Sequence, residues 1–301
     1  MNMPEFLQKG IRRDDHVTCR KGWAANLAIF RIIFFGLVAL PWAVRFYHWA
    51  VATLPNLADS LWITISFYRF IPLGVLHDVN FVQTLALVNI VAIVLALVGF
   101  QTRISAGLAA LFSLYLFGLM ENQGKVDHFH HVIWFMAMLA AGEAGEMFSV
   151  DAIIYAIKRA DSGEIQREIP TENALKLLRY IWILLGLLYL GSGLAKLSSA
   201  LTAGWAGALN LQNILLRRWI ELSWYDPNFT IPLRIDRLPH WILEPLGWGA
   251  ILFEVCFIFF VLFRIFRPTL AIAGLIFHIG NGIFLGIWFT TLFPVYVCLF
   301  D

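Results

Sequence analysis

The chain has 301 residues, of which 60% are hydrophobic, 15% are aromatic and only 14% are charged. Soluble globular domains carry roughly a quarter charged residues, so this composition excludes an ordinary soluble domain and indicates a polytopic membrane protein. The formal net charge of +2 is too small to favour nucleic acid as a partner, and no basic patch is interleaved with aromatic residues.

The N-terminal segment is polar and leads into a long apolar run without the small-residue cleavage pattern of a signal peptide. We therefore expect residues 1–22 to form a cytoplasmic tail and residues 23–301 to form a single transmembrane domain. The cysteines at Cys19, Cys256 and Cys298 have no spacing typical of a disulfide framework, a redox pair or a zinc site.

Six apolar runs are long enough to cross a bilayer, which takes roughly 17 to 25 residues. In chain order they cover residues 23–46, 81–100, 104–120, 128–150, 174–197 and 241–263. A seventh run, 268–300, is too long for one perpendicular helix, since about 22 residues already reach about 33 Å. Gly286 and Pro294 are places where this run can break into one span and a re-entrant segment or second span.

Two further segments, 61–76 and 205–224, are only partly apolar and are expected to form interfacial or half-buried helices. The predicted fold class is therefore all-α, a polytopic transmembrane helical bundle of about seven or eight spans plus one or two interfacial helices. A cytoplasmic N-terminus places most Lys and Arg residues on the inner side, in agreement with the positive-inside rule. The basic residues between Arg217 and Arg237 weaken that agreement.

The first polar cluster is GKVDHFHH, residues 124–131. On a helix, Asp127, His128 and His131 share a face and His130 points elsewhere. Two or three ligands within one turn are too few for a metal ion, so no metal site is assigned. Two interpretations remain open: structural hydrogen bonding with Asp127 as the N-cap, or a proton relay or substrate-orienting histidine.

The second polar cluster surrounds Lys196, near the end of the apolar run YIWILLGLLYLGSGLAKL. A cation at that depth costs several kcal/mol unless it snorkels, pairs or loses its proton. Snorkelling is the ordinary explanation, whereas a partly desolvated lysine can act as a base. Tyr189 lies two helical turns earlier and shares the face of Lys196. The glycines Gly186, Gly191 and Gly193 indicate close packing against another helix.

The third polar cluster is FHIGN, in which His278 and Asn281 face the same way at membrane depth. Polar groups at this depth face the interior of the bundle, where they hydrogen-bond neighbouring helices or line a pocket. Arg31 and Glu254 add an intramembrane cation and carboxylate, and an ion pair between them is one interpretation. This number of ionisable groups exceeds what a scaffold requires, so we expect some of them to have a function.

At these residues the chain resembles the HTTM superfamily, the membrane domain shared by vitamin K-dependent gamma-carboxylases, sporulation-delaying toxin maturation proteins and many bacterial proteins. The resemblance begins at about Asn26 and covers most of the chain. It depends on five features in the same order: ANLAIFRIIFFG, VGFQTR, GKVDHFHH leading to FSVDA, YLGSGLAKL and FHIGN. It implies a multi-pass protein of a cell membrane, such as the bacterial inner membrane.

The resemblance also implies roles for individual residues. Lys196 matches the lysine regarded as the base that deprotonates vitamin K hydroquinone, which makes a quinol the implied cofactor. His128 matches a histidine implicated in carboxylation, with Asp127 in place of an asparagine. His278 and Asn281 match the F-H-x-x-N motif. In the implied chemistry, oxygen adds to the deprotonated quinol, and the strong base so formed abstracts an inert C–H proton in a water-poor pocket.

Two functions from different classes are therefore expected. The first is an integral membrane enzyme that uses a quinol and oxygen on a small-molecule, peptide or lipid substrate, with Lys196 as base and His128 and His278 assisting. Modification of a protein substrate is not expected, because the given chain stops at Asp301. The second is a non-enzymatic membrane partner in the maturation or export of a secreted peptide. A transporter is a weaker third possibility, since no inverted repeat is visible.

Overall fold

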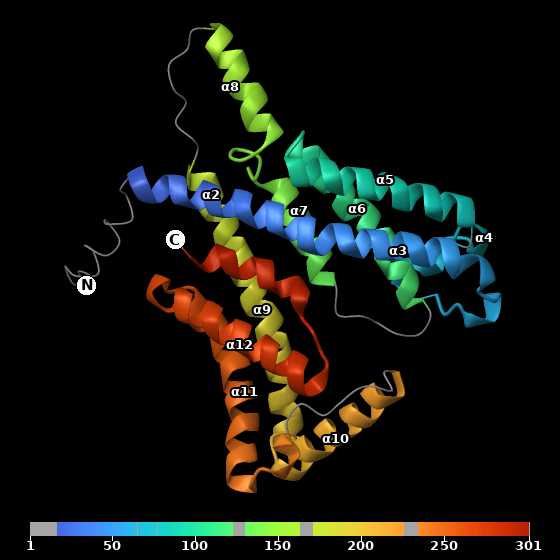
Figure 1. The fold of residues 1–301 in the computed structure, drawn as a ribbon, viewed down its shortest axis with the longest axis vertical. Helices are drawn as coiled ribbons and strands as arrows, with labels where there is room; N and C mark the ends of the chain where they lie inside the picture. The colour runs from blue at the N-terminus through green and yellow to red at the C-terminus, as the bar shows by residue number, and fades with distance from the viewer. Residues whose placement is uncertain are drawn as a thin grey trace. The chain divides into compact units, whose positions relative to one another are not determined.

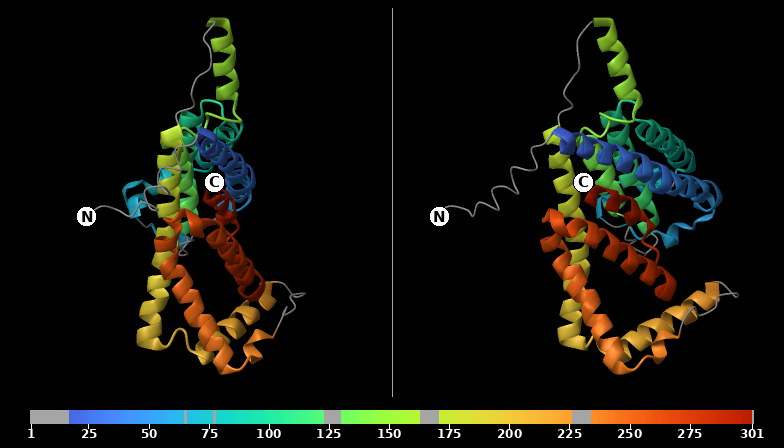
Figure 2. Two further views of the ribbon diagram at one scale, coloured as in Figure 1. Left: turned by 90° about the vertical axis from the view of Figure 1, so that its left-hand side faces the viewer. Right: turned by 60° about the vertical axis from the view of Figure 1, so that its left-hand side comes forward.

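The computed structural model describes residues 17–64, 66–76, 78–122, 130–162, 171–225 and 234–300, and every regular element in these ranges is helical. The chain divides into two compact units, Met1–Leu178 and Arg179–Phe300. The helices of each unit are drawn in Figure 1, and each unit is described by itself. Helix α9, Thr171–Ala203, runs without a break from the end of the first unit into the second (Figure 2).

The first unit begins with one long helix that contains a π-helical turn. Its parts are α2 (Val17–Phe34), the π turn η1 (Phe35–Ala39) and α3 (Leu40–Ala52). The span predicted at 23–46 is present and continues several residues further. The buried side chains before the turn include Phe30 and Phe34, and those after it include Phe46.

Helices α5 (Val79–Val98) and α6 (Thr102–Glu121) form an antiparallel pair beside α3 (Figure 1). Asp78 caps the start of α5, where its carboxylate accepts a hydrogen bond from the backbone N–H of Phe81 at 3.0 Å. Between the two helices, the buried Asn89 donates to the hydroxyl of Ser113 at 3.1 Å. Both helices confirm the spans predicted at 81–100 and 104–120 to within a few residues.

The prediction of one continuous span over 128–150 is wrong. Helix α7 covers His130–Ala141, and a separate amphipathic helix, α8, begins at Val150 and ends at Ser162 with no buried residue. The turn between them contains Phe148 at φ 48. Arg31 accounts for the break, because its guanidinium donates to the carbonyls of Ala144 at 2.7 Å and Phe148 at 2.5 Å. The freed carbonyls are thus satisfied without a helix.

The segment predicted as a helix over 61–76 is instead a series of short helical turns, with one break at Pro72 and with Arg69 inside a turn. These turns are η3 (Asp59–Leu61), η4 (Ser66–Phe70) and α4 (Leu73–Leu76). Tyr68 is buried and donates to the carbonyl of Leu114 at 3.1 Å. Burial raises the pKa of the Tyr68 phenol. The segment therefore covers one end of the first unit through its aromatic side chains.

The second unit contains α9, α10 (Ala208–Tyr225), α11 (His240–Val261), α12 (Arg267–Leu285) and the 3₁₀ helix η7 (Thr290–Leu299). The predicted break at Gly286 is confirmed, since this residue ends α12 in the left-handed region at φ 62. The break expected at Pro294 is wrong, because Pro294 lies inside η7. The half-buried helix expected at 205–224 corresponds to α10, whose Trp219 donates to the carbonyl of Phe284 at 2.8 Å.

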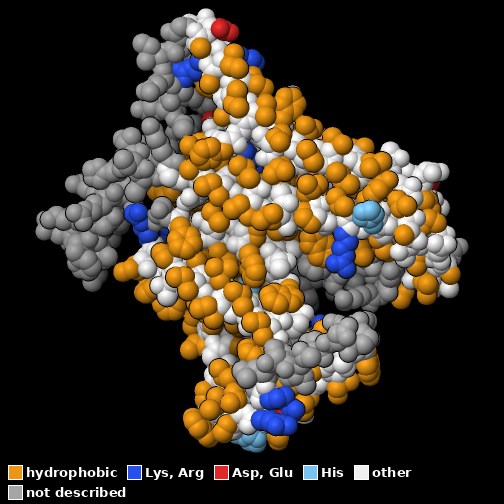
Figure 3. Space-filling view, in the orientation of Figure 1, with side chains coloured by type: hydrophobic (Ala, Val, Ile, Leu, Met, Phe, Trp, Pro, Cys, Tyr) orange, Lys and Arg blue, Asp and Glu red, His pale blue; other side chains and the backbone are white. Residues whose placement is uncertain are grey.

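In the described ranges, six helical segments are long and apolar enough to cross a membrane, and α7 and η7 are shorter apolar helices. Hydrophobic side chains cover most of the face drawn in Figure 3, and Lys and Arg form only small groups there. Side chains such as Leu37, Ile104 and Phe259 are more than half exposed, which is costly in water and favourable in lipid. The chain is therefore a multi-pass membrane protein, as composition predicts; the expected count of seven or eight spans stays a prediction.

Candidate functional site

Two glycines bring helices α9 and α11 into close contact. A Cβ atom added at Gly186 would lie 2.8 Å from the side chain of Ile258, and one at Gly193 would lie 2.9 Å from Val255 N. The close packing predicted for these glycines is confirmed. It is wrong for Gly191, where an added Cβ would meet no atom within 4 Å. The face of α9 that carries Gly186 and Gly193 therefore approaches the backbone of α11.

This close approach places a lysine against a carboxylate at membrane depth. Lys196 Nζ lies 2.5 Å and 2.6 Å from the two carboxylate oxygens of Glu254. Ser192, one turn before Lys196, accepts a hydrogen bond from Nζ at 3.0 Å and donates one to Glu254 at 3.3 Å. The side chain of Glu254 is 4% exposed and that of Lys196 is 26% exposed. Of the three ways to accommodate the lysine, the structure shows pairing.

The Lys196–Glu254 pair lies beside aromatic rings. Lys196 Nζ is 5.6 Å from the ring centroid of Trp205 and 6.0 Å from that of Phe277. The ring of Phe277 packs against Phe253 of α11 with centroids 5.2 Å apart. The partly exposed amine therefore has flat apolar surfaces next to it, which is an arrangement typical of cation–π contact.

A second polar group, made of Tyr189, His278 and Tyr296, lies in the same unit. The phenol oxygen of Tyr189 is 2.9 Å from His278 Nε2 and also hydrogen-bonds the hydroxyl of Tyr296. All three side chains are buried. The ring of Tyr189 stacks on Phe257 with centroids 4.2 Å apart. Phe277 joins the two groups, since its ring centroid is 6.4 Å from that of Tyr189 and it also faces Lys196.

The structure thus brings together four predicted site residues: Lys196 with Glu254, and Tyr189 with His278. Asn281 lies one turn after His278 and is half-buried, and its backbone carbonyl accepts a hydrogen bond from Ile287 N at 3.2 Å. Sequence reasoning missed three residues: Ser192, Trp205 and Tyr296. The i, i+4 spacing to Lys196 could have found Ser192. No comparable signal marks Tyr296, which reaches Tyr189 through the turn at Gly286.

Arg31 does not pair with Glu254, so the ion pair considered between them is wrong. Arg31 is fully buried in the first unit, at the turn between α5 and α6. A Cβ at Gly99 (φ 72) would lie 2.8 Å from the Arg31 guanidinium and 2.4 Å from Ser149 Cβ. Asp151 accepts hydrogen bonds there from Gln101 N at 2.7 Å and Thr102 N at 2.8 Å. This junction, Arg31 with residues 99–102 and 144–151, joins the motifs that contain FRIIFFG, VGFQTR and FSVDA.

The histidine cluster at 124–131 is described only in part, because Asp127 and His128 lie outside the described residues. His131 is buried, with its ring centroid 6.3 Å from that of Phe135. His130 points elsewhere, as predicted, and its Nε2 lies 2.8 Å from Glu121 Oε1. In the described ranges, no group of three or more His, Cys, Asp or Glu residues has a metal-binding arrangement.

The sequence model of the HTTM domain matches residues 20–301, nearly the whole chain. The chain belongs to the HTTM family. No curated protein and no solved structure matches it. In this HTTM protein the features expected to carry the family resemblance fall into two sets. The segments FRIIFFG, VGFQTR and FSVDA meet at the Arg31 junction in the first unit, and YLGSGLAKL and FHIGN meet around Phe277 in the second.

Proposed function

We propose that this HTTM protein is an integral membrane enzyme that removes a proton from a quinol-like hydroxyl at the Lys196–Glu254 pair. The observation that carries this proposal is the pair itself: an amine and a carboxylate at 2.5 Å on two membrane-capable helices, the carboxylate buried and the amine partly exposed beside aromatic rings. Buried ionisable groups in spans are costly and mark functional sites more often than structural ones.

The two groups of the pair act as one unit for proton uptake. The amine and the carboxylate share one titratable proton in the resting pair, and the pair can bind one further proton. Whichever atom holds the shared proton, uptake of a second leaves an ammonium beside a neutral acid. Glu254 is then the final acceptor, and Lys196 faces the oxyanion that forms on the substrate. This assignment extends the prediction of Lys196 as the base.

The residues around Lys196 fit a planar aromatic group. Trp205 and Phe277 offer flat faces within 6.0 Å of the amine, and Phe253 backs Phe277. When bound, a quinol would supply the electrons for an oxidative reaction with oxygen. The aromatic side chains would hold it and exclude water, while Lys196 and Glu254 would bind and deprotonate its hydroxyl. The buried Tyr189–His278–Tyr296 group, which contacts Phe277, would hold the Phe277 ring in place and would hold a proton at His278.

Several parts of the proposal follow from the family resemblance. The substrate that is oxidised or deprotonated is a small molecule, a peptide or a lipid, and His128 assists the reaction. The distribution of Lys and Arg, and not the resemblance, supports a cytoplasmic N-terminus, which places Lys196 near the opposite side of the membrane. The contacts of Lys196 support the proton-abstracting step, and the family resemblance supports the later oxidative steps.

The test is oxygen consumption by the full chain in nanodiscs supplied with a reduced menaquinone or vitamin K. We expect quinol-dependent uptake in the wild type and a decrease of about 10²-fold or more in Lys196→Ala and Glu254→Gln. Arg217→Ala provides the control, because it removes an exposed salt bridge to Glu221 on α10 (3.0 Å), away from the pair. Thermal unfolding of each variant separates loss of chemistry from loss of fold.

The alternative, a non-enzymatic partner in peptide maturation or export, is favoured by the extent to which the polar groups satisfy one another within the helices. Under that function the double variant Lys196→Met/Glu254→Leu keeps its fold and a small partner protein co-purifies with it. Full quinol-dependent activity in Lys196→Ala, measured in an active wild-type preparation, would remove the enzyme proposal.

A further inference from the structure

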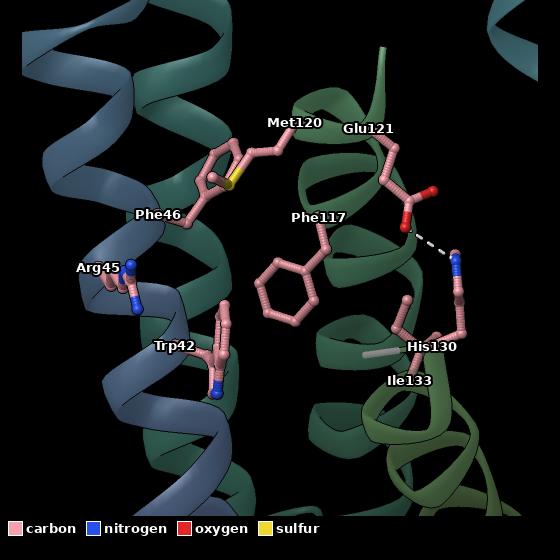
Figure 4. Close-up of a pocket in the computed structure, with 8 residues that line it drawn as sticks. All are labelled: Trp42, Arg45, Phe46, Phe117, Met120, Glu121, His130 and Ile133. Carbon is pink, nitrogen blue, oxygen red and sulfur yellow. Dashed lines mark ion pairs between the residues drawn. The ribbon is translucent and has the colours of Figure 1, made fainter. Parts of the chain in front are cut away.

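A pocket in the first unit lies where α3, α6 and α7 meet, and it shares no residue with the proposed enzymatic site (Figure 4). Its volume is ≈ 80 Å³. Helix α3 lines one side, and α6 and α7 line the other. The lining residues are Trp42, Arg45, Phe46, Phe117, Met120, Glu121, His130 and Ile133.

The walls of the pocket are mainly aromatic and mutually supported. The ring centroid of Phe117 lies 6.4 Å from those of Trp42 and Phe46, so the three rings hold one another in place across α3 and α6. Met120 and Ile133 complete the apolar surface. Ordinary ligand sites enclose about 300 to 1,000 Å³. This pocket is smaller, so it fits one end of a ligand whose remainder stays in the bilayer.

Of the charged side chains that line the pocket, Glu121 has an ion-pair partner and Arg45 has none among the described residues. Glu121 is paired with His130 at 2.8 Å, and its side chain is only 12% exposed. Figure 4 shows this pair on the side opposite Arg45. The guanidinium of Arg45 lies 5.5 Å from the ring centroid of Trp42, and among the described residues no carboxylate is within ion-pair distance of it. Within the described part of the chain, Arg45 is therefore a cation at the pocket with an aromatic neighbour and no ion-paired carboxylate, since the carboxylate of Glu121 is paired with His130.

The position of the pocket along its helices matches that of a lipid headgroup. Arg45 lies in the later part of the first candidate span, Gly22–Asn56, while Glu121 ends α6 and His130 begins α7. Amphiphiles keep their charged heads at this boundary and their chains in the hydrocarbon. A guanidinium there matches carboxylate and phosphate oxygens through its fork of N–H donors.

We propose that this pocket binds the anionic head of a single-chain amphiphile, with Arg45 as the counter-charge and Trp42, Phe46 and Phe117 around the first carbons of its chain. A carboxylate from a fatty acid and a phosphate from a lysophospholipid share the chemistry that Arg45 recognises. The site is separate from the Lys196–Glu254 pair, so it stands whether or not that pair catalyses a reaction.

The experiment is photo-crosslinking of the full chain in nanodiscs with a palmitic acid that carries a diazirine near its carboxylate. We expect labelled peptides from 40–52 and 112–122. Arg45→Gln should reduce labelling about 10-fold or more, because a charge-assisted contact is lost, and Arg45→Lys should retain part of it. Glu121→Gln removes a charge of the opposite sign from the same pocket and should increase labelling.

Competition identifies the source of the anionic head. Displacement of the probe by palmitic acid but not by lysophosphatidic acid indicates a fatty acid, and the reverse order of potency indicates a lysophospholipid. Hexadecanol, which has the same chain length and no charge, is the neutral control and should not displace the probe. Equal labelling of the wild type and a folded Arg45→Gln variant, or equal competition by hexadecanol, would overturn the proposal. Thermal unfolding with and without palmitic acid checks that each variant is folded.

Discussion

At the scale of single residues, Gly99 illustrates how one backbone conformation holds three segments of the first unit together. It ends α5 at φ 72 and lies against both Arg31 and Ser149. Its carbonyl accepts a hydrogen bond from Asp151 N at 2.9 Å. A side chain at this position would be strained by the backbone and would also displace the guanidinium that binds the carbonyls of Ala144 and Phe148.

We therefore expect Gly99→Ala to lower the free energy of unfolding by about 2 to 5 kcal/mol, from positive-φ strain and overpacking together. The measurement is thermal or denaturant unfolding in detergent. Gly22→Ala in α2 is the control, since an added Cβ there meets nothing within 4 Å, and it should be neutral or slightly stabilising. Equal stability of the Gly99→Ala variant and wild type would show that the Arg31 junction contributes little.

The residue scale also shows what a sequence can predict about the candidate site. Lys196, Tyr189 and His278 could be found because polar groups in apolar runs are rare and spacing places them on helix faces. Glu254 was recognised as intramembrane, but Lys196 was not recognised as its partner, because spacing within one helix says nothing about contacts between helices. Tyr296 was missed because, unlike Tyr189, it has no predicted site residue within two helical turns of it.

At the scale of helices, the contact between α9 and α11 depends on which glycine faces α11. Gly193 does and Gly191 does not, although they are two residues apart on α9. Gly193→Ala should push α11 away next to Glu254, weaken the Lys196–Glu254 pair and destabilise the protein by about 1 to 3 kcal/mol. Gly191→Ala should be neutral or slightly stabilising and should leave quinol-dependent oxygen uptake unchanged.

These two variants form a matched pair, because each adds one methyl group to the same helix. Thermal unfolding and oxygen uptake are measured on both. The close contact would lose its proposed importance if both variants behaved alike.

Apolar runs predicted α5, α6 and α11 well because these helices are uniformly hydrophobic. The region 128–150 was mispredicted because the segment GEAGEMFS, residues 142–149, was included in the span despite its two glycines and two glutamates. The helix ends there, and Arg31, more than a hundred positions earlier, binds two carbonyls of the turn.

At the scale of the whole molecule, α7 bears on membrane topology despite its short length. Its first residue, His130, pairs with Glu121 at the end of α6, and the turn after it meets the start of α6, where Arg103 Nε donates to Gly142 O at 3.3 Å. Helix α7 and the turn 142–149 therefore return along α6. Helix α8 then begins on the side where α6 begins, and the next candidate span along the chain is α9.

With a cytoplasmic N-terminus, this path places Ser162 inside and Thr202 outside. The test uses single cysteines at Ser162 and Thr202 in a chain whose native cysteines are replaced by serine. An impermeant thiol reagent should label Thr202→Cys on intact cells and Ser162→Cys only after permeabilisation. The opposite pattern would invert the orientation, and labelling of both from one side would contradict the path itself.

The π turn Phe35–Ala39 gives the first span a defined place where its length can change. A π turn contains one residue more than the α-helical turn it replaces, so the helices on either side keep their buried faces when that residue is removed. Leu37, in the middle of this turn, is 74% exposed. Its deletion would relax the turn into regular α-helix, whereas deletion of Ala28 would rotate the preceding residues by about 100° and turn the buried Trp23 and Ala24 toward lipid.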